Sequence, residues 1–461
     1  MSAVPLKSAL HKNDLNYHLH PQTELAQHEL LGPHIFTEGN GIYVKDIEGR
    51  EYIEGMAGLW CASLGFSETR LARAADNQLR KLPFYHNFAH RTTPVAVELA
   101  EQLVSIAPGS VSRAFFTNSG SEANDNMVKL VWYYNNVKGR TAKKKIISRH
   151  GAYHGITVAA SSLTGMSYAH TFFDVPMDAV FHTDCPHRYH FAEAGESEEE
   201  FATRMVANIE KLIESEGPET VAAFIAEPVM GAGGVILPPA TYFEKVQRLL
   251  RKHDILFVAD EVICGFGRTG NMFGCDTFDI TPDIVVVAKA LSSGYIPIGA
   301  LLISDEIYHT LVEGSRQVGT FGTGFTYSGH PVSCAVALET LKIYRDLNIV
   351  ERVRDISPRF LSRLHQFNDH PLVGETRGVG LIGGIELVRD KTSKENFDPS
   401  MKVGALAANL ALEQGIIVRA LRNDTIAFCP PLIITIDEIK EMFDRFEKAM
   451  ENLSSTVEGY A

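Results

Sequence analysis

The stretch Asp283-Ile-Val-Val-Val-Ala-Lys289-Ala-Leu-Ser-Ser-Gly-Tyr-Ile-Pro-Ile-Gly299 decides how the rest of the chain is interpreted. Its β-branched run, Ile284 to Val287, predicts a short strand that is buried on both faces. Lys289 follows at the carboxyl end of this strand, where burial favours the neutral amine. A neutral amine is a nucleophile that can form a Schiff base. The alternative is that Lys289 runs its stem along apolar surface and keeps a hydrated charge.

Strand, turn and helix patterns alternate through the middle of the chain. The sequence predicts strands at residues 113–117, 145–148, 221–226, 255–259 and 284–287, and helices at 121–137, 197–217 and 241–253. This alternation is typical of an α/β fold with a mostly parallel sheet. Ligands of such sheets bind beyond the carboxyl ends of the strands, which is where Lys289 lies.

The two ends of the chain carry other patterns. Residues 1–35 predict an irregular arm, and residues 42–53 predict a hairpin. After about residue 335, helices at 334–344, 349–367 and 436–453 alternate with short strands at 377–387, 416–419 and 426–428. We therefore expect residues 1–75 to form an arm and part of a small α+β domain, residues 76–335 a large domain, and residues 336–461 the rest of the small domain.

Composition excludes several classes of protein. The formal net charge of −13 argues against a nucleic-acid-binding or anionic-membrane surface. The six cysteines are scattered without a C-x-x-C pair, which indicates reduced thiols rather than a disulfide framework. Residues 1–19 lack the apolar core of a signal peptide, and no apolar stretch approaches the length of a membrane span. A cytoplasmic enzyme with small-molecule substrates fits these features.

Three further features follow predicted strands. Thr117-Asn-Ser-Gly-Ser-Glu122 leads into a helix whose backbone N–H groups favour an anion, although an ordinary helix cap explains it too. Asp260-Glu261 could pair with a cation or cap a helix. Gly151-Ala-Tyr-His-Gly155 places an aromatic side chain in a tight turn, where it could stack on a planar ligand or simply pack. An anion cradle, a carboxylate, an aromatic ring and a Schiff-base lysine are together what pyridoxal 5′-phosphate (PLP) requires.

These motifs carry a resemblance to a known family. The matching segments are residues 116–122, 153–155, 226–229, 256–270, 288–289 and 324–331, in the family's order. The chain resembles the class III aminotransferases, which are PLP enzymes of fold type I, and it is most similar to the ω-amino acid and amine:pyruvate transaminases. The resemblance implies a ping-pong transfer of an amino group from an amine or ω-amino acid to pyruvate.

The resemblance also assigns roles to individual residues. Lys289 forms the Schiff base with PLP and moves the proton. Asp260 pairs with the pyridine nitrogen, and Val262 and Tyr153 pack on the two faces of the ring. The remaining cofactor residues are Gly120 and Ser121 at the phosphate, Glu227 near the ring, and Thr326, which reaches the phosphate in the neighbouring subunit. The last role implies a homodimer with shared active sites, which could pair further into a tetramer.

Substrate choice is expected to depend on Arg419, which matches the family arginine that binds substrate carboxylate. Relatives that use 2-oxoglutarate commonly place a Glu where this chain has Ala232, and that Glu pairs with the arginine. Without such a partner, Arg419 is expected to bind the keto acid or swing away from an amine donor. Trp60 and Phe88 match aromatic pocket walls, with a core role as the alternative for Trp60.

Several alternatives remain open from the sequence. Met230 replaces a usual Gln, which makes the local pocket more apolar and leaves the cofactor contacts there open. A 2-oxoglutarate-dependent aminotransferase, or a PLP aminomutase or decarboxylase, could share this fold. A PLP-binding regulator would need a basic DNA-reading segment, and the sequence contains none.

Two motifs suggest other chemistry. Residues 265–270 spell G-x-G-x-x-G, but no helical pattern follows, which disfavours a dinucleotide site. His182, Cys185, His187 and His190 could be metal ligands, but no second ligand pair has the spacing of a structural site, so no metal is expected.

Overall fold

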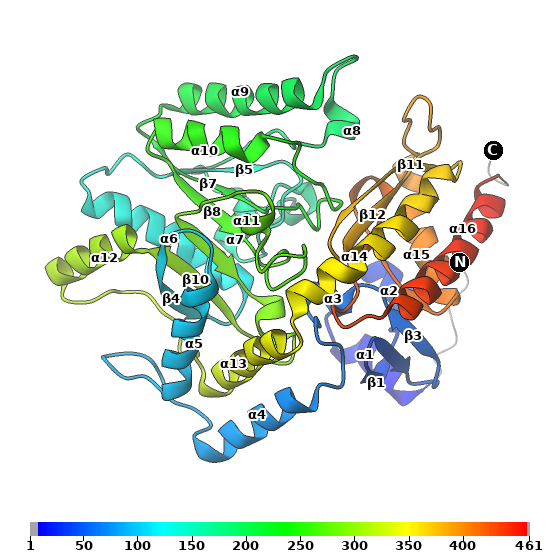
Figure 1. The fold of residues 1–461 in the computed structure, drawn as a ribbon, viewed down its shortest axis with the longest axis horizontal. Coiled ribbons are helices and arrows are strands. Elements are labelled where there is room, and N and C mark those ends of the chain that lie inside the picture. The colour runs from blue at the N-terminus through cyan, green and yellow to red at the C-terminus, as the bar shows by residue number, and fades with distance from the viewer. Residues whose placement is uncertain (1–7, 459–461) are drawn as a thin grey trace.

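A seven-stranded sheet forms the centre of the larger lobe in the computed structural model, which describes residues 8–458 (Figure 1). Its strand order is β4-β10-β9-β8-β7-β5-β6. The strands are β4 (Val111–Thr117), β5 (Lys145–Arg149), β6 (Val180–Thr183), β7 (Val221–Ala226), β8 (Leu256–Asp260), β9 (Ile284–Val287) and β10 (Gly299–Ser304). Neighbours pair in parallel except β10, which is antiparallel to both β4 and β9. The predicted mostly parallel sheet is confirmed.

Helices cover both faces of this sheet because its central strands are apolar on both sides. In β7, Phe224 packs in one core with α9 (Glu198–Glu216) and α10 (Tyr242–Lys252). Its neighbour Ile225 packs in the opposite core with α6 (Gly120–Val137), α7 (Val158–Leu163) and α12 (Asp305–Val318). Helix α13 (Pro331–Asp346) packs against both α4 (Thr69–Lys81) and α5 (Pro94–Ile106) in the lower part of the view in Figure 1.

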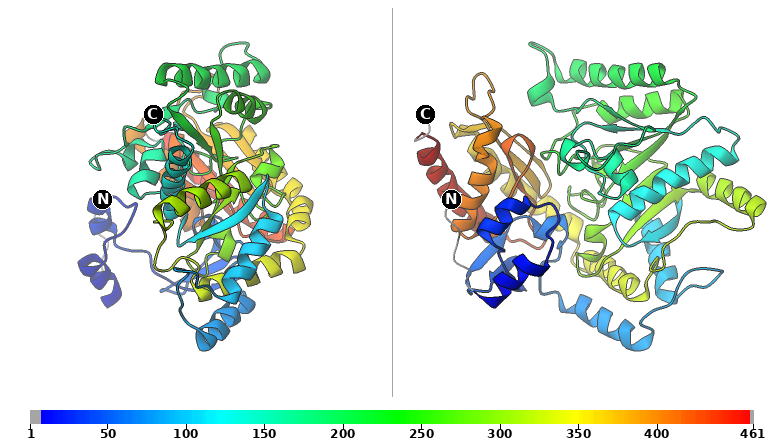
Figure 2. Two further views of the ribbon diagram at one scale, coloured as in Figure 1. Left: turned by 90° about the vertical axis from the view of Figure 1, so that its left-hand side faces the viewer. Right: turned by 180° about the vertical axis from the view of Figure 1, so that it is seen from behind.

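The smaller lobe contains two four-stranded sheets. One has the order β1 (Phe36–Asn40), β2 (Tyr43–Asp46), β3 (Glu51–Glu54), β13 (Ile416–Ile417), and the other β11 (Val373–Val379), β12 (Ile382–Leu387), β15 (Thr425–Phe428), β14 (Arg419–Ala420). Helices α14 (Ile349–Gln366), α15 (Val403–Glu413) and α16 (Ile436–Glu458) pack on these strands. Because β13 pairs in parallel with β3, segments from both ends of the chain build this lobe, as predicted (Figure 2).

The structure corrects the prediction for the N-terminal arm. Residues 8–35 are not irregular, since they contain α1 (Ala9–Tyr17) and α2 (Leu25–Leu31); residues 1–7 lie outside the described part. Strands β6 and β10 and helix α12 were not predicted. The predicted helix at 197–217 is α9, which begins with a capping box between Ser197 and Glu200.

The domain limits after residues 75 and 335 remain proposals. Both fall inside helices, α4 and α13, that pack against each other. Between residues 8 and 458, no helix is long and apolar enough to cross a membrane.

Candidate active site

Lys289 lines a cavity of about 330 Å³ at the carboxyl ends of β4, β7, β8 and β9. After the buried strand β9, the backbone turns sharply, and Lys289 has a φ of 47°, in the left-handed region that non-glycine residues rarely adopt. Such strained conformations persist where the surrounding structure holds them and are frequent at active sites. Burial lowers the pKa of the Lys289 ammonium, which favours the nucleophilic amine.

Asp260 lies in the same cavity, at the end of β8. Its Oδ2 accepts hydrogen bonds from Asn124 Nδ2 at 3.0 Å and from His154 Nδ1 at 2.8 Å, and its Oδ1 accepts from the Val262 N–H at 3.1 Å. Burial raises the pKa of Asp260, but the hydrogen bonds, His154 first, outweigh burial and leave the pKa below its usual value. The carboxylate is therefore held ionised, ready to pair with a cation in the cavity.

Glu227 follows β7 and is also buried in the cavity wall. Its Oε2 has no hydrogen-bond partner within the described chain, and the nearest cation is Arg149, 3.6 Å away. Burial raises the pKa of Glu227 to about 7. Two carboxyl groups with opposite pKa shifts thus lie in one cavity, with Asp260 ionised and Glu227 able to hold a proton near neutral pH.

The N-terminus of α6 forms the other end of the cavity. Gly120 and Ser121 open this helix, and the Ser121 hydroxyl accepts a hydrogen bond from the Ile156 N–H at 3.1 Å. A Cβ at Gly120 would lie 3.1 Å from Val262, and one at Gly155 would lie 2.5 Å from Ser121 Oγ. Both glycines therefore keep space open beside a helix N-terminus that favours an anion.

These features fit PLP. The cavity offers an amine for the aldehyde, an ionised carboxylate for the pyridine nitrogen and a helix N-terminus for the phosphate. Val262 and Tyr153 both line it, as predicted for side chains that contact the ring.

Arg419 lines a second, larger cavity of about 1270 Å³, and Tyr153 lines both cavities. The centroid of the Trp60 ring lies 5.7 Å from Lys289 Nζ and 5.3 Å from Arg419 Cζ. Trp60 itself lines neither cavity and is buried in a core cluster, as the alternative for this residue has it. Ala232 lines the Arg419 cavity, and in residues 8–458 no carboxylate forms an ion pair with Arg419. Met230 is buried instead beside Cys185, with the two sulfur atoms 3.9 Å apart.

Phe88 and Thr326 do not line either cavity in the single chain. Thr326 is exposed, and Phe88 is 45% exposed on a loop that contacts the segment around Gly324. The surrounding surface carries further exposed aromatic side chains, Phe84, Tyr85 and Tyr327. The pocket-wall role predicted for Phe88 is therefore not seen in the single chain, and the role predicted for Thr326 concerns a neighbouring subunit and stays a prediction.

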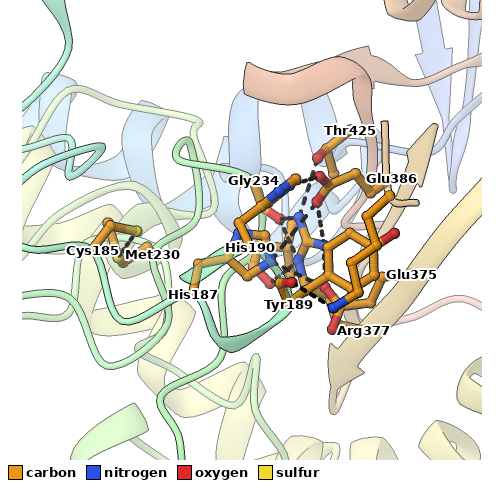
Figure 3. A network of polar contacts seen from close by, with 12 residues as sticks. Cys185, His187, Tyr189, His190, Met230, Gly234, Glu375, Arg377, Glu386 and Thr425 are labelled. Carbon is orange, nitrogen blue, oxygen red and sulfur yellow. Dashed lines mark hydrogen bonds and ion pairs between the residues drawn. The ribbon is translucent and has the colours of Figure 1, made fainter. Parts of the chain in front are cut away.

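The histidine-rich loop that suggested a metal site takes part in an ionic network instead (Figure 3). His187 contacts Glu375 at 3.0 Å, and His190 contacts Glu386. Arg377 binds both carboxylates, each at 2.7 Å. Cys185 lies apart, against Met230, as Figure 3 shows. The guanidinium of Arg377 pairs with both carboxylates, so this network joins the loop to β11 and β12. That the loop holds no metal stays a prediction.

The structure adds residues that the sequence reasoning did not assign. His154 and Asn124 hold the carboxylate of Asp260, and Cys61 and Tyr168 line the two cavities. His154 stands next to Tyr153 in the motif of residues 151–155, and this position was the only sequence feature that pointed to it. Residues 265–270 form turns rather than the start of a helix, in agreement with the rejection of a dinucleotide site.

Comparisons with known proteins agree with this site. The family described as Aminotransferase class-III matches residues 26–450. Gamma aminobutyrate transaminase 3 (chloroplastic) of Solanum lycopersicum is 53% identical over 429 residues, covering 93% of this chain and 82% of its own. The omega transaminase of Pseudomonas jessenii, solved in complex with PMP, is 52% identical with a TM-score of 0.96, covering 98% of this chain and 99% of its own. A transaminase structure with L-Ala is 54% identical with a TM-score of 0.90, covering 92% of this chain and all (100%) of its own.

The family match spans almost the whole described chain, and the solved relatives share its fold. The fold is therefore that of the fold-type I aminotransferases, with the lysine, carboxylate and anion cradle placed in one cavity. This protein belongs to the class III aminotransferases and is a PLP-dependent enzyme.

Proposed function

We propose that the enzyme transfers an amino group from an amine or ω-amino acid to pyruvate. The observation that supports it most directly is Arg419, a cation in the larger cavity that has no carboxylate partner and has Ala232 beside it. A cation left free in this way can bind the carboxylate of a small keto acid. The transaminase relative solved with L-Ala, the amino acid that pyruvate yields, supports this acceptor.

The proposed donor is an amine or ω-amino acid. Such a donor has no α-carboxylate for Arg419, so the same cavity must accept first the donor and then the keto acid with a single arginine. When a donor without an α-carboxylate enters, Arg419 must turn away or bind a distal carboxylate. Tyr153 and Tyr168 then offer aromatic surface to an apolar chain. The gamma aminobutyrate transaminase of tomato, at 53% identity, supports an ω-amino acid as one donor.

In the proposed mechanism, bound PLP supplies an electron sink for the donor carbon. The remaining work belongs to side chains of this chain. With PLP bound, Lys289 Nζ, whose pKa is lowered by burial, would take the proton from the donor carbon and pass it to the cofactor carbon within the same half-reaction. In the second half-reaction it would move a proton the opposite way, to the carbon of the keto acid that becomes the amino acid. Asp260 stays ionised through its bonds from His154 and Asn124 and stabilises positive charge at the pyridine nitrogen.

Separate half-reactions test the donor and the acceptor. The holoenzyme is first mixed with 4-aminobutyrate or 1-phenylethylamine, freed of donor, and then given pyruvate or 2-oxoglutarate, with the amino acid product identified by chromatography. The proposal expects alanine from pyruvate with rates well above those for glutamate from 2-oxoglutarate. Glutamate as the faster product would contradict the acceptor assignment based on Arg419 and Ala232.

We further propose a homodimer in which each chain completes the site of its partner. Phe88 and Thr326 are exposed and away from their own cavities, on a surface rich in exposed aromatic side chains. Mixing inactive Lys289→Ala chains with chains inactivated at Thr326 tests this, because refolded mixtures should regain activity in the sites that combine two intact halves. A tetramer and a cytoplasmic location remain predictions.

A further inference from the structure

Three histidines surround the carboxylate of Asp14 near the N-terminus. Asp14 lies on α1, His18 directly follows this helix, His20 lies in the loop after it, and His28 lies on α2. His20 Nε2 lies 2.9 and 3.0 Å from the two Asp14 oxygens, His28 Nε2 lies 3.0 Å from Oδ2, and His18 Nδ1 lies 3.2 Å from Oδ1. Four side chains from two helices and a loop thus converge at one point.

Asp14 and His28 form the buried side of the cluster, and His18 forms its exposed side, with 62% of its side chain exposed. The His20 ring centroid lies 4.3 Å from that of His18 and 4.2 Å from that of His28. The side chains of Asp14 and His28 are only 14% and 12% exposed. Converging imidazoles around one carboxylate are a donor set that divalent transition-metal ions prefer.

The distances suit a metal ion. In a tetrahedral zinc site, nitrogen and oxygen donors lie about 2.0–2.2 Å from the ion, so neighbouring donors are roughly 3.3 Å apart. The contacts around Asp14 measure 2.9–3.2 Å, and the ligand atoms of Asp14, His18 and His20 all lie within 4.8 Å of one another. A metal ion could replace the hydrogen-bonding protons between these donor atoms. The closest donor atoms would have to move apart by a few tenths of an ångström, with modest rotations of the side chains.

This cluster differs from the buried network of His187, His190 and Glu386 in one decisive respect. There, the guanidinium of Arg377 already neutralises the carboxylate. At Asp14, every ion-pair partner in the described part of the chain is a histidine. No lysine or arginine pairs with this carboxylate in that part of the chain, so it remains available to a metal cation.

We propose that Asp14, His18, His20 and His28 form a binding site for Zn²⁺ or a similar divalent transition-metal ion. Asp14, His18 and His20 supply three donor atoms, and His28, which contacts the other Asp14 oxygen, completes or supports the set. The ion joins α1 to α2 across the loop between them.

The site has a consequence for substrate access. Residues 21–24, which connect His20 to α2, line the same cavity as Arg419 and Tyr168. A metal ion that fixes the ends of this loop therefore fixes one wall of the substrate cavity. We expect the bound ion to change KM for large donors more than for small ones, since only large donors reach that wall.

The test uses tag-free holoenzyme and Zn²⁺ alone. Calorimetric titration and elemental analysis after gel filtration should give about one Zn²⁺ per chain, and the double variant Asp14→Asn, His20→Gln should lose it. His28→Ala should weaken binding by about 10- to 100-fold, the usual effect of a supporting residue. His309→Gln, at an exposed position on α12, is the matched control and should bind as the unaltered enzyme does.

Two results would overturn the proposal: no stoichiometric Zn²⁺ in the unaltered enzyme, or unchanged binding in the double variant. Retained PLP absorption and circular dichroism show that each variant is folded. X-ray absorption of the zinc-loaded, unaltered enzyme gives a second test that needs no variant. Only nitrogen and oxygen neighbours are expected, and sulfur neighbours would assign the ion to cysteines instead.

Discussion

Above pH 7, a variant with glutamine in place of Glu54 should be more stable than the unaltered protein. Near pH 4, the ionisation of Glu54 should contribute no difference in stability between the two proteins. Glu54 ends β3 and is buried, and its Oε1 accepts a hydrogen bond from the Met56 N–H at 2.9 Å. Burial raises its pKa from 4.5 to about 7, against the smaller opposite effect of the backbone N–H groups. The folded state therefore keeps a proton on Glu54 that the unfolded state releases.

The size of the effect follows from this pKa. Because the folded-state pKa lies above the unfolded value, the stabilisation is complete below pH 4.5 and is lost as the pH rises through 7. At about 1.4 kcal/mol for each pKa unit, the loss approaches 3 kcal/mol at pH 8. Glutamine resembles the protonated acid and keeps the carbonyl acceptor for Met56, so it avoids this loss. A misplaced amide would cost about 1 kcal/mol at every pH, which leaves the pH dependence intact.

Urea unfolding of both proteins at pH 5 and pH 8 measures the difference. The variant should gain roughly 2.5 kcal/mol relative to the unaltered protein between the two pH values, because the unfolded-state carboxyl is already partly ionised at pH 5. Glu451→Gln, at an exposed position on α16, should gain nothing. A difference between variant and unaltered protein that is the same at pH 5 and pH 8 would refute the argument that Glu54 is protonated in the folded state.

Three further changes have defined outcomes. Gly155→Ala places a Cβ 2.5 Å from Ser121 Oγ, at a residue whose φ is 124°. The resulting strain of about 1–3 kcal/mol should raise the Kd for PLP, measured by equilibrium dialysis, about tenfold or more. An unchanged Kd would disprove the role given to this turn. Arg419→Leu removes a charge-assisted hydrogen bond to the keto acid, worth about 1.5–3 kcal/mol. The value of kcat/KM for pyruvate should therefore fall roughly 10- to 150-fold, while the half-reaction with 1-phenylethylamine changes little. Equal losses in both half-reactions would argue against a carboxylate-binding role. Arg377→Met leaves two glutamates of the Figure 3 network without their cation and should cost about 3–5 kcal/mol of stability by urea unfolding, and a loss below 1 kcal/mol would show that the network is not needed.

The sequence predicted those parts of the site that depend on local patterns. Lys289, Asp260 and Glu227 each follow an apolar strand, and parallel strands bring their carboxyl ends to one edge, so their meeting in one cavity was foreseeable. The hydrogen bonds that hold Asp260 were not, because Asn124 reaches it from the middle of a helix and carries no motif.

Other parts could not be predicted for physical reasons. Strand β10 is an apolar run of Leu and Ile that follows a Gly-Tyr-Ile-Pro turn, and a run of that kind fits a strand or a buried helix equally well. Helices α1 and α2 are short and mostly exposed, so they lack the apolar stripe that marks a helix in sequence. The role predicted for Thr326 depends on a partner, which a single sequence does not place, and Phe88, predicted as a pocket wall, lies exposed outside both cavities.

The antiparallel strand β10 also bears on how the enzyme is made. Strand β4, which leads to the anion cradle, pairs within its sheet only with β10, and Thr117 at its end is opposite Gly299. The cradle therefore cannot be anchored until the ribosome has synthesised residues 299–304. Contacts this distant in the chain form slowly, and the exposed edge of β4 is meanwhile open to aggregation. Ribosome-bound chains that end before β10 should therefore depend on chaperones, and PLP capture should begin only after that strand has emerged.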